Sequence, residues 1–335
     1  MPTRSYKNPA LSSAPLAGAR VQLEHVCVRY EGADRNAVDD VTLDVPPGQF
    51  VVFLGPSGSG KSTLLRTINR LAPITSGTIF LGERNVLDED LVRLRRGIGY
   101  VIQAVGLFPH LTVAQNIAVV PQLLGWERMR TQRRVDELLE MIRLEPARYR
   151  DRLPRQLSGG EAQRVGVARA LAAQPPVLLM DEPFGAVDPI VRLALGDELL
   201  EIHRALRTTI FFVTHDVDEA LRIADRIVVL RNGNIEQDDT PLRTLAHPAT
   251  PYVANLVDAR NSVRRLVLLG VRDAMRPTAA DAPPAPARIA ADRSLQEALS
   301  ALLSGGDDLD VYDGEARVGR LDFQDIRRAL AASAA

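Results

Sequence analysis

The chain has 335 residues, which is enough for one large domain and a smaller second one. Its formal net charge of −1 argues against a nucleic-acid partner, because general nucleic-acid binders carry a strongly basic balance or face. The single Cys27 excludes an internal disulfide framework, and no apolar run approaches the roughly 18–20 residues that cross a bilayer. Any work at a membrane is therefore expected at its cytoplasmic face, by a peripheral protein held through a partner.

Residues 1–20 lack the apolar centre of a signal peptide and are expected to form a flexible N-terminal tail. Strands are then expected at 21–30, 37–45 and 49–54, and helical spacing follows from Leu64 to Leu71. Residues from about 104 to 172 are mostly helical in pattern, and strand-like runs return at 177–180, 210–213 and 227–230. This alternation predicts an α/β domain over residues 21–255, with a largely parallel sheet covered on both faces and an inserted helical subdomain.

The composition changes after residue 255. Residues 256–290 are expected to form a connector that ends in a linker rich in proline and alanine. Beyond it, Ser294 and Glu297 have capping-box spacing at the start of a helix. Two short strands at 309–312 and 316–321, joined at Asp313-Gly314, and a last helix over about 323–331 complete a small acidic α/β unit at 291–335.

Residues 55–62 fit the phosphate-binding pattern G-x-x-x-x-G-K-[ST], and they follow an expected strand and open an expected helix. Glycines let backbone N–H groups turn toward phosphate oxygens, and the start of the helix favours an anion. Lys61, one of two lysines in the chain, is expected to reach the β- and γ-phosphates, and the Ser62 hydroxyl to bind Mg²⁺. The expected nucleotide-binding residues here are Gly55, Pro56, Ser57, Gly58, Ser59, Gly60, Lys61, Ser62 and Thr63.

Several polar side chains follow expected strands. Asp181 ends a buried run and is expected to hold Mg²⁺ through water, while Glu182 projects elsewhere and is expected to act as the general base. His215 follows the strand at 209–214, where it can reach a γ-phosphate, and Gln103 can contact both Mg²⁺ and the attacking water. Tyr30 is a candidate for stacking on adenine. The Asp-Glu pair could instead be an ordinary end of a strand. Tyr30 could instead be an aromatic residue of the core.

The sequence Leu-Ser-Gly-Gly occurs twice. At 157–160 it opens a helical pattern, so Ser158 is expected to cap the helix, and the amides of Gly159 and Gly160 to face an anion. At 303–306 the same four letters end a helix and precede two aspartates, which repel phosphate. The first copy is therefore the candidate site and the second is expected to be a C-terminal turn.

The order of these features resembles the nucleotide-binding subunits of ABC transporters over about residues 20–250. The resemblance implies a P-loop NTPase of the ABC type that binds ATP and Mg²⁺ and works as a head-to-tail dimer. In that dimer, residues 158–160 of one copy complete the ATP site of the other, and Asp188 lies at the contact. The chain departs from the family at Glu161, where glutamine is common, and at Val187, where leucine is usual.

Two further segments narrow the class. Residues 103–113 resemble the segment with which bacterial importers dock their permease, and residues 114–126 are similar to ATPases of glycine betaine, choline and proline betaine importers. The last two expected strands and the last helix, which include residues 319–326, resemble half of a CBS pair, so 291–335 is expected to be a CBS-like half module. Such domains are found on ATPases of quaternary-amine importers. The resemblance thus implies a translocase ATPase with transmembrane permease subunits and an extracytoplasmic substrate-binding protein as partners.

Three alternatives remain beside osmoprotectant import. The chain could energise an importer of another small solute. It could be a soluble ABC ATPase of DNA repair or translation, although the sequence has neither sustained heptads nor a second ATPase half. A P-loop kinase would leave the Leu-Ser-Gly-Gly helix start and His215 without a role.

Overall fold

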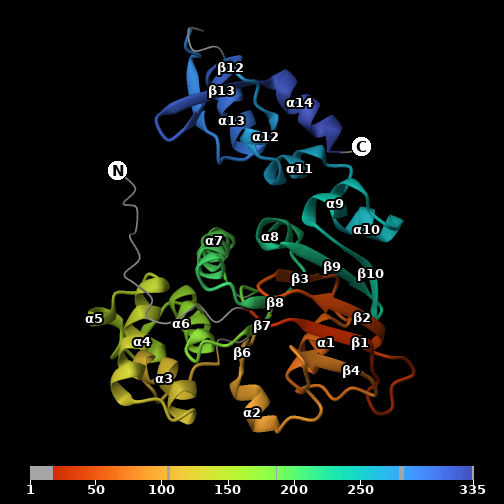
Figure 1. The fold of residues 1–335 in the computed structure, drawn as a ribbon, viewed down its shortest axis with the longest axis vertical. Helices are drawn as coiled ribbons and strands as arrows, with labels where there is room; N and C mark the ends of the chain where they lie inside the picture. Colours follow the sequence, from red (N-terminus) through yellow and green to blue (C-terminus); the bar gives the residue numbers. More distant parts are fainter. Residues whose placement is uncertain (1–17, 104–105, 186, 279–282, 334–335) are drawn as a thin grey trace. The chain divides into compact units, whose positions relative to one another are not determined.

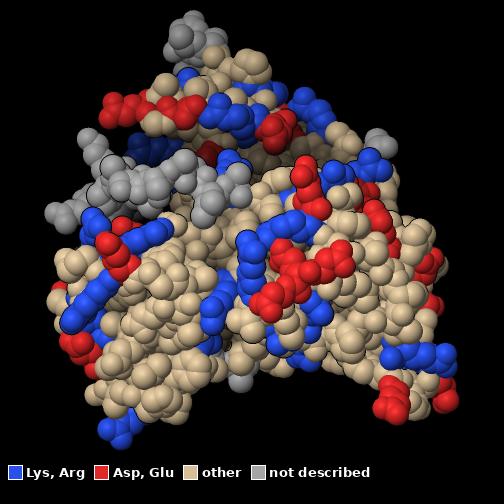
Figure 2. Space-filling view, turned by 60° about the horizontal axis from the view of Figure 1, so that its bottom comes forward, with Lys and Arg blue, Asp and Glu red and all other residues tan. Residues whose placement is uncertain are grey.

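The computed structural model describes residues 18–103, 106–185, 187–278 and 283–333. The chain divides into two compact units, the first comprising residues 1–215 and 230–234 and the second residues 216–229 and 235–335. Ala104 and Val105 of the predicted docking segment, and most of the predicted N-terminal tail, lie outside the described residues. On the face drawn in Figure 2, acidic and basic side chains are interspersed.

A four-stranded antiparallel sheet stands at the start of the first unit. Its order is β2-β1-β4-β5, with β1 at Val21–Val28, β2 at Val38–Val45, β4 at Ser76–Leu81 and β5 at Arg84–Asn85. In β2, apolar residues alternate with polar ones, and the apolar set is buried. Strands β4 and β5 were missed by the sequence prediction, because Ser76–Leu81 has no clear alternation of its own.

The second sheet has six strands in the order β10-β9-β3-β8-β7-β6. Strands β3 (Phe50–Leu54), β8 (Thr209–Thr214), β7 (Val177–Asp181) and β6 (Ile98–Val101) are parallel neighbours. Every residue of β3, β7 and β8 is buried, which is why these strands are continuous apolar runs in the sequence. The predicted α/β class is confirmed, and the carboxyl ends of the strands lie at one edge.

Helices flank these strands in the first unit (Figure 1). They are α1 (Lys61–Ile68), α2 (Leu91–Arg96), α3 (Val113–Leu123), α4 (Arg128–Met141), α5 (Pro146–Tyr149), α6 (Gly159–Leu171) and α7 (Pro189–Leu206). Helices α3 to α6 group together and account for most of the predicted helical insertion. A capping box between Thr112 and Gln115 starts α3, and Val135, Leu138 and Leu139 form the buried face of α4.

The last residues of the predicted tail are held to the domain. The Gly18 amide donates to the carbonyl of Arg207 at 3.0 Å, and the Ala19 amide to that of Pro176 at 3.2 Å. A Cβ on Gly18 would lie 2.5 Å from the Thr209 hydroxyl, so this close approach requires glycine. The prediction of a flexible tail up to residue 20 is therefore wrong for these last residues.

The second unit begins with α8 (Val217–Ile223), β9 (Arg226–Arg231), β10 (Asn234–Asp239), α9 (Pro241–Ala246) and α10 (Pro251–Leu256). Its C-terminal part contains α11 (Ser262–Leu268), α12 (Val271–Ala274), β11 (Ala287–Ala290), α13 (Leu295–Gly305), β12 (Asp308–Asp313), β13 (Ala316–Asp322) and α14 (Phe323–Ala332). Helix α13 begins at the predicted Ser294–Glu297 capping box, and the second Leu-Ser-Gly-Gly does end it. No helix among the described residues is both long and apolar enough to cross a membrane.

The C-terminal part has a core of its own, larger than the sequence predicted. Strand β11 pairs in parallel with β12, and β12 pairs antiparallel with β13, giving a three-stranded sheet. Leu266 of α11 and Val271 of α12 are buried in the same core as Leu321 of β13. The segment 256–290 is thus not only a connector, because it supplies two helices and a strand to this fold.

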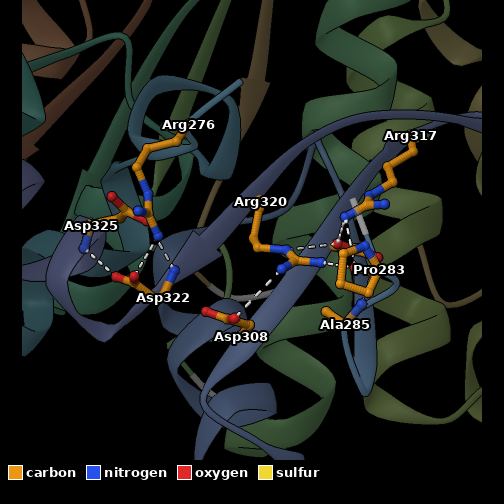
Figure 3. A network of polar contacts seen from close by, with 9 residues as sticks. Arg276, Pro283, Ala285, Asp308, Arg317, Arg320, Asp322 and Asp325 are labelled. Atoms are coloured by element: carbon orange, nitrogen blue, oxygen red, sulfur yellow. Dashed lines mark hydrogen bonds and ion pairs between the residues drawn. The ribbon is translucent and has the colours of Figure 1, made fainter. Parts of the chain in front are cut away.

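Ion pairs to buried carboxylates tie the strands of this part to the chain before them (Figure 3). Asp310 is 2% exposed and accepts from Arg317 at 2.7 Å, from Arg320 at 3.1 Å and from the Ala285 amide at 2.8 Å. Although burial opposes ionisation, these donors hold the pKa of Asp310 below its ordinary value. Arg276 likewise reaches Asp325 at 2.9 Å. These polar contacts therefore hold the segment before β11 to β12, in addition to the pairing of β12 with β13.

Candidate nucleotide-binding site

The phosphate-binding loop lies between β3 and α1 at the carboxyl edge of the parallel strands. Gly55 and Gly60 have φ values of 156° and 103°, and a Cβ on either would lie 2.4 Å from a carbonyl oxygen, of Leu230 or of Ala37. Gly58 (φ 79°) faces open space instead. Two of the glycines are therefore required by packing, while the third leaves its backbone amide approachable by a ligand.

Lys61 is folded back over this loop. Its ammonium group donates to the carbonyls of Gly55 at 2.7 Å and Pro56 at 2.8 Å, and the residue is only 4% exposed. Burial lowers the pKa of Lys61, and the nearby carboxylates of Glu182 and Asp181 oppose that effect. A cation held among loop carbonyls at the start of α1 is placed to exchange these contacts for phosphate oxygens.

Asp181 ends β7 and is 3% exposed. Its Oδ1 accepts from the Ser62 hydroxyl at 2.6 Å, and its Oδ2 accepts from the Nε and Nη2 of Arg66 at 3.2 and 2.9 Å. The Tyr100 hydroxyl lies 3.4 Å from the same Oδ2. Ser62 and Asp181, both predicted as metal-binding residues, are thus in direct contact, although 119 positions separate them.

The next residue, Glu182, points elsewhere because its backbone enters the left-handed region, with φ 44°. Its Oε2 lies 3.3 Å from the Nδ1 of His215 at the end of β8, and 3.5 Å from the Nε2 of Gln103 after β6. The ends of three neighbouring strands therefore bring together the three residues predicted to be catalytic. The carboxylate predicted to be the base and the one predicted to hold the metal are kept apart by the turn.

Tyr30 lies beside the loop helix and not in the core. It is 48% exposed, and its hydroxyl lies 3.2 Å from the Oγ1 of Thr63 in α1. An exposed ring at this position can stack on a planar base, with the phosphates in the loop. The alternative that Tyr30 is an ordinary core aromatic is therefore wrong.

The Leu-Ser-Gly-Gly segment forms the start of α6, as predicted. Ser158 accepts from the Glu161 amide at 3.3 Å, and the Glu161 carboxylate accepts from the Ser158 amide at 2.7 Å, so a glutamate completes the capping box. A Cβ on Gly159 would meet nothing within 4 Å, which leaves this helix start open to a ligand. Asp188 is exposed immediately before α7. Neither segment belongs to the cluster around Asp181 and Glu182.

The residues present fit ATP with Mg²⁺. The loop offers backbone amides and one buried ammonium to phosphates, and the Ser62–Asp181 pair offers a hydroxyl and a carboxylate, which are oxygen ligands that Mg²⁺ prefers. The carboxylate of Glu182 contacts Gln103 and His215. This arrangement suits displacement at a terminal phosphate by water.

Residues 38–185 match the protein-family model described as "ABC transporter". The glycine betaine uptake system ATP-binding protein YehX of Escherichia coli is 46% identical over 310 residues, which cover 91% of this chain and 98% of that protein. The chain belongs to the ATP-binding proteins of ABC transporters. The osmoprotectant import ATP-binding protein OsmV of Salmonella typhimurium is 49% identical over 246 residues, 73% of this chain and 64% of OsmV, so the match spans just under two thirds of that relative.

A solved ABC cassette shares the fold of about two thirds of the chain. It is described as the dimeric structure of a post-hydrolysis state of the ATP-binding cassette MJ0796 bound to ADP and Pi. It is 35% identical, with a TM-score of 0.59, and covers 66% of this chain and 98% of its own length. The likeness thus extends over the ATPase fold and not over the whole of this ABC protein.

Two residues at the ABC site were not singled out from the sequence. Arg66 and Tyr100 surround Asp181, but they lie 115 and 81 positions away from it along the chain. Arg66 lies in a helix that was predicted from the spacing of its apolar residues alone. Tyr100 lies in a short strand. Nothing in the local pattern around either residue indicates a contact with the end of β7, so only the parallel order β6-β7 could have suggested Tyr100.

Proposed function

We propose that this protein is the ATP-hydrolysing subunit of an ABC importer for osmoprotectants, with glycine betaine or a related quaternary amine as the solute. The observation that carries the ATPase part is the meeting of Ser62 with Asp181, and of Glu182 with Gln103 and His215, at one sheet edge beside the phosphate loop. The printed functions of OsmV and YehX support the solute class.

In this proposal the residues have distinct roles. Lys61 and the loop amides hold the phosphates, Ser62 and Asp181 hold Mg²⁺, and Tyr30 stacks on adenine. When bound, Mg²⁺ neutralises charge that develops on the phosphate oxygens. Glu182 accepts a proton from the attacking water, and Gln103 and His215 orient that water and the terminal phosphate.

A second copy of the chain completes each site. The open start of α6 presents the amides of Gly159 and Gly160 and the hydroxyl of Ser158 to the nucleotide of the partner copy. Asp188 lies at the contact between the copies. The dimeric form of the MJ0796 cassette supports this arrangement.

The remaining partners follow from import. Transmembrane permease subunits dock on the segment 103–113 at the cytoplasmic face of the membrane, and an extracytoplasmic protein delivers the solute. The C-terminal part, with β11, α13, β12, β13 and α14, is a CBS-like half module that regulates transport. Pairing between two copies completes the module.

The substitution Glu182→Gln tests the ATPase part. We expect the variant to bind ATP with unchanged affinity, to lose hydrolysis, and to accumulate as a dimer with ATP and Mg²⁺ in size-exclusion chromatography. Glu201→Gln is a matched control, because Glu201 is an exposed residue of α7 paired with Arg143 at 2.8 Å. Normal hydrolysis in Glu182→Gln would remove Glu182 as the base.

Reconstitution tests the transport part. The chain is assembled in proteoliposomes with its permease and binding protein, and ATP-dependent uptake of glycine betaine and choline is measured, with an amino acid and a sugar as comparison solutes. We expect uptake of a quaternary amine only. Uptake of a comparison solute instead would indicate another small-solute importer. A chain that hydrolyses ATP but does not assemble with the permease would indicate a soluble ABC ATPase.

A further inference from the structure

Asp181 is held on both of its carboxylate oxygens, by two residues of α1 and one of β6. Ser62 of α1 donates to Oδ1 at 2.6 Å, and Arg66, one helical turn further along α1, donates twice to Oδ2, at 2.9 and 3.2 Å. The hydroxyl of Tyr100 of β6 lies 3.4 Å from the same Oδ2. The Asp181 side chain is 4% exposed, so water has little access to take over these contacts.

We propose that Arg66, supported by Tyr100, is a positioning residue that fixes the rotamer of Asp181 and thereby raises the affinity of the site for the divalent cation. The inference rests on the proposed metal site of Ser62 and Asp181. Arg66 acts through Asp181 and does not contact the cation itself.

The need for such a residue follows from the side chain of aspartate. Its terminal torsion is broad, so the plane of the carboxylate can tilt when nothing else holds it. The two donors of Arg66 on Oδ2, opposite Ser62 on Oδ1, hold this plane in one orientation. The carboxylate is then oriented before the cation binds, so the free energy of cation binding is not reduced by the entropy cost of ordering this side chain.

The opposite effect of Arg66 is electrostatic. A guanidinium beside Asp181 repels a second cation, and its removal would by that route tighten metal binding. The Arg66 side chain is 47% exposed, whereas the carboxylate it holds is buried, so solvent screens the repulsion more than it weakens the hydrogen bonds. Loss of orientation on removing Arg66 would weaken metal binding, whereas loss of repulsion would tighten it. We expect the effect of orientation to be the larger one.

The experiment measures Mn²⁺ binding to the full-length chain in the presence of ADP, by electron paramagnetic resonance of free Mn²⁺. For Arg66→Ala we expect the dissociation constant for Mn²⁺ to rise about tenfold, as for loss of a charge-assisted hydrogen bond to a buried group. Arg66→Lys keeps the charge but not the fork and should recover part of the affinity. ADP affinity in EDTA should stay unchanged in every variant.

Two further variants guard the result. Tyr100→Phe removes one supporting hydroxyl without shortening the ring, and a rise of about twofold to threefold is expected. Arg95→Ala is the matched control, because exposed Arg95 donates to the carbonyls of Asn69 and Arg70. Unchanged or tighter Mn²⁺ binding in folded Arg66→Ala would overturn the inference. If Arg66→Ala does not fold, unchanged binding in Tyr100→Phe overturns it. A wild-type chain that binds no Mn²⁺ with ADP would overturn the metal site itself.

Discussion

The substitution Leu321→Ala tests whether the C-terminal core folds as a unit of its own. Leu321 of β13 is 0% exposed and packs in one core with Leu309 and Val311. A buried Leu→Ala change costs about 2–5 kcal/mol, and a unit of roughly 70 residues has about 4–10 kcal/mol of stability in total. A loss of about 3 kcal/mol raises its unfolded fraction about 100-fold, because each 1.4 kcal/mol is a factor of ten.

Hydrogen–deuterium exchange read by mass spectrometry measures this loss locally. Amides of β12 and β13 should lose about 100-fold protection, while those of the buried strand β7 keep theirs and ATP hydrolysis is unchanged. Leu303→Ala is the matched control, because this leucine of α13 is 73% exposed and its truncation should change protection little. An equal loss of protection in β7 would refute the reasoning, since the two cores would then unfold together.

Three other substitutions probe the ATPase unit. Gly99→Ala places a Cβ 2.6 Å from a carbonyl of α6 and should lower the free energy of unfolding, measured by chemical denaturation, by about 1–3 kcal/mol. Gly97→Ala is the control and should lower it much less, because the nearest neighbour of its Cβ would lie at 3.4 Å. Equal losses of stability in the two variants would contradict this reasoning. Glu161→Gln should flatten the acid side of the melting-temperature profile. The hydrogen bond from the Tyr149 hydroxyl, and then the one from the Ser158 amide, hold the pKa of Glu161 below its ordinary value. Its stabilisation is therefore present above the ordinary pKa and is lost as pH falls through the lowered one. An unchanged acid profile would contradict this. Tyr30→Ala should weaken binding of a fluorescent ATP analogue at least tenfold while Tyr30→Phe keeps it, and equal weakening would remove the stacking role.

The features read correctly from the sequence are those with a local cause. The phosphate loop needs glycines at two positions where packing leaves no room for a Cβ, so its letters are visible without any partner. Strands β3, β7 and β8 are buried on both faces and therefore appear as uninterrupted apolar runs. The helix that starts at Ser294 carries its own capping box.

The features that were missed depend on distant partners. Strand β11 is a four-residue segment amid prolines and alanines, and it becomes a strand only because β12 pairs with it in parallel. Leu266 and Val271 enter the C-terminal core from a segment read as a connector. Arg66 shows the same limit at the site, because its role is defined by a carboxylate on a strand far along the chain.

The division of labour between two consecutive carboxylates depends on the backbone of Glu182. Asp181 completes β7 and faces Ser62, and the left-handed φ of 44° at Glu182 then turns the next side chain toward His215. A glutamate in this region costs about 1–3 kcal/mol, and the surrounding bonds hold it there: its amide donates to Val213 and its carbonyl accepts from Gly185, both at 3.1 Å. Glutamine has the same size and the same backbone preference. Loss of hydrolysis in Glu182→Gln would therefore report on the carboxylate itself, whereas a glycine there would also relax the turn that keeps the two functions apart.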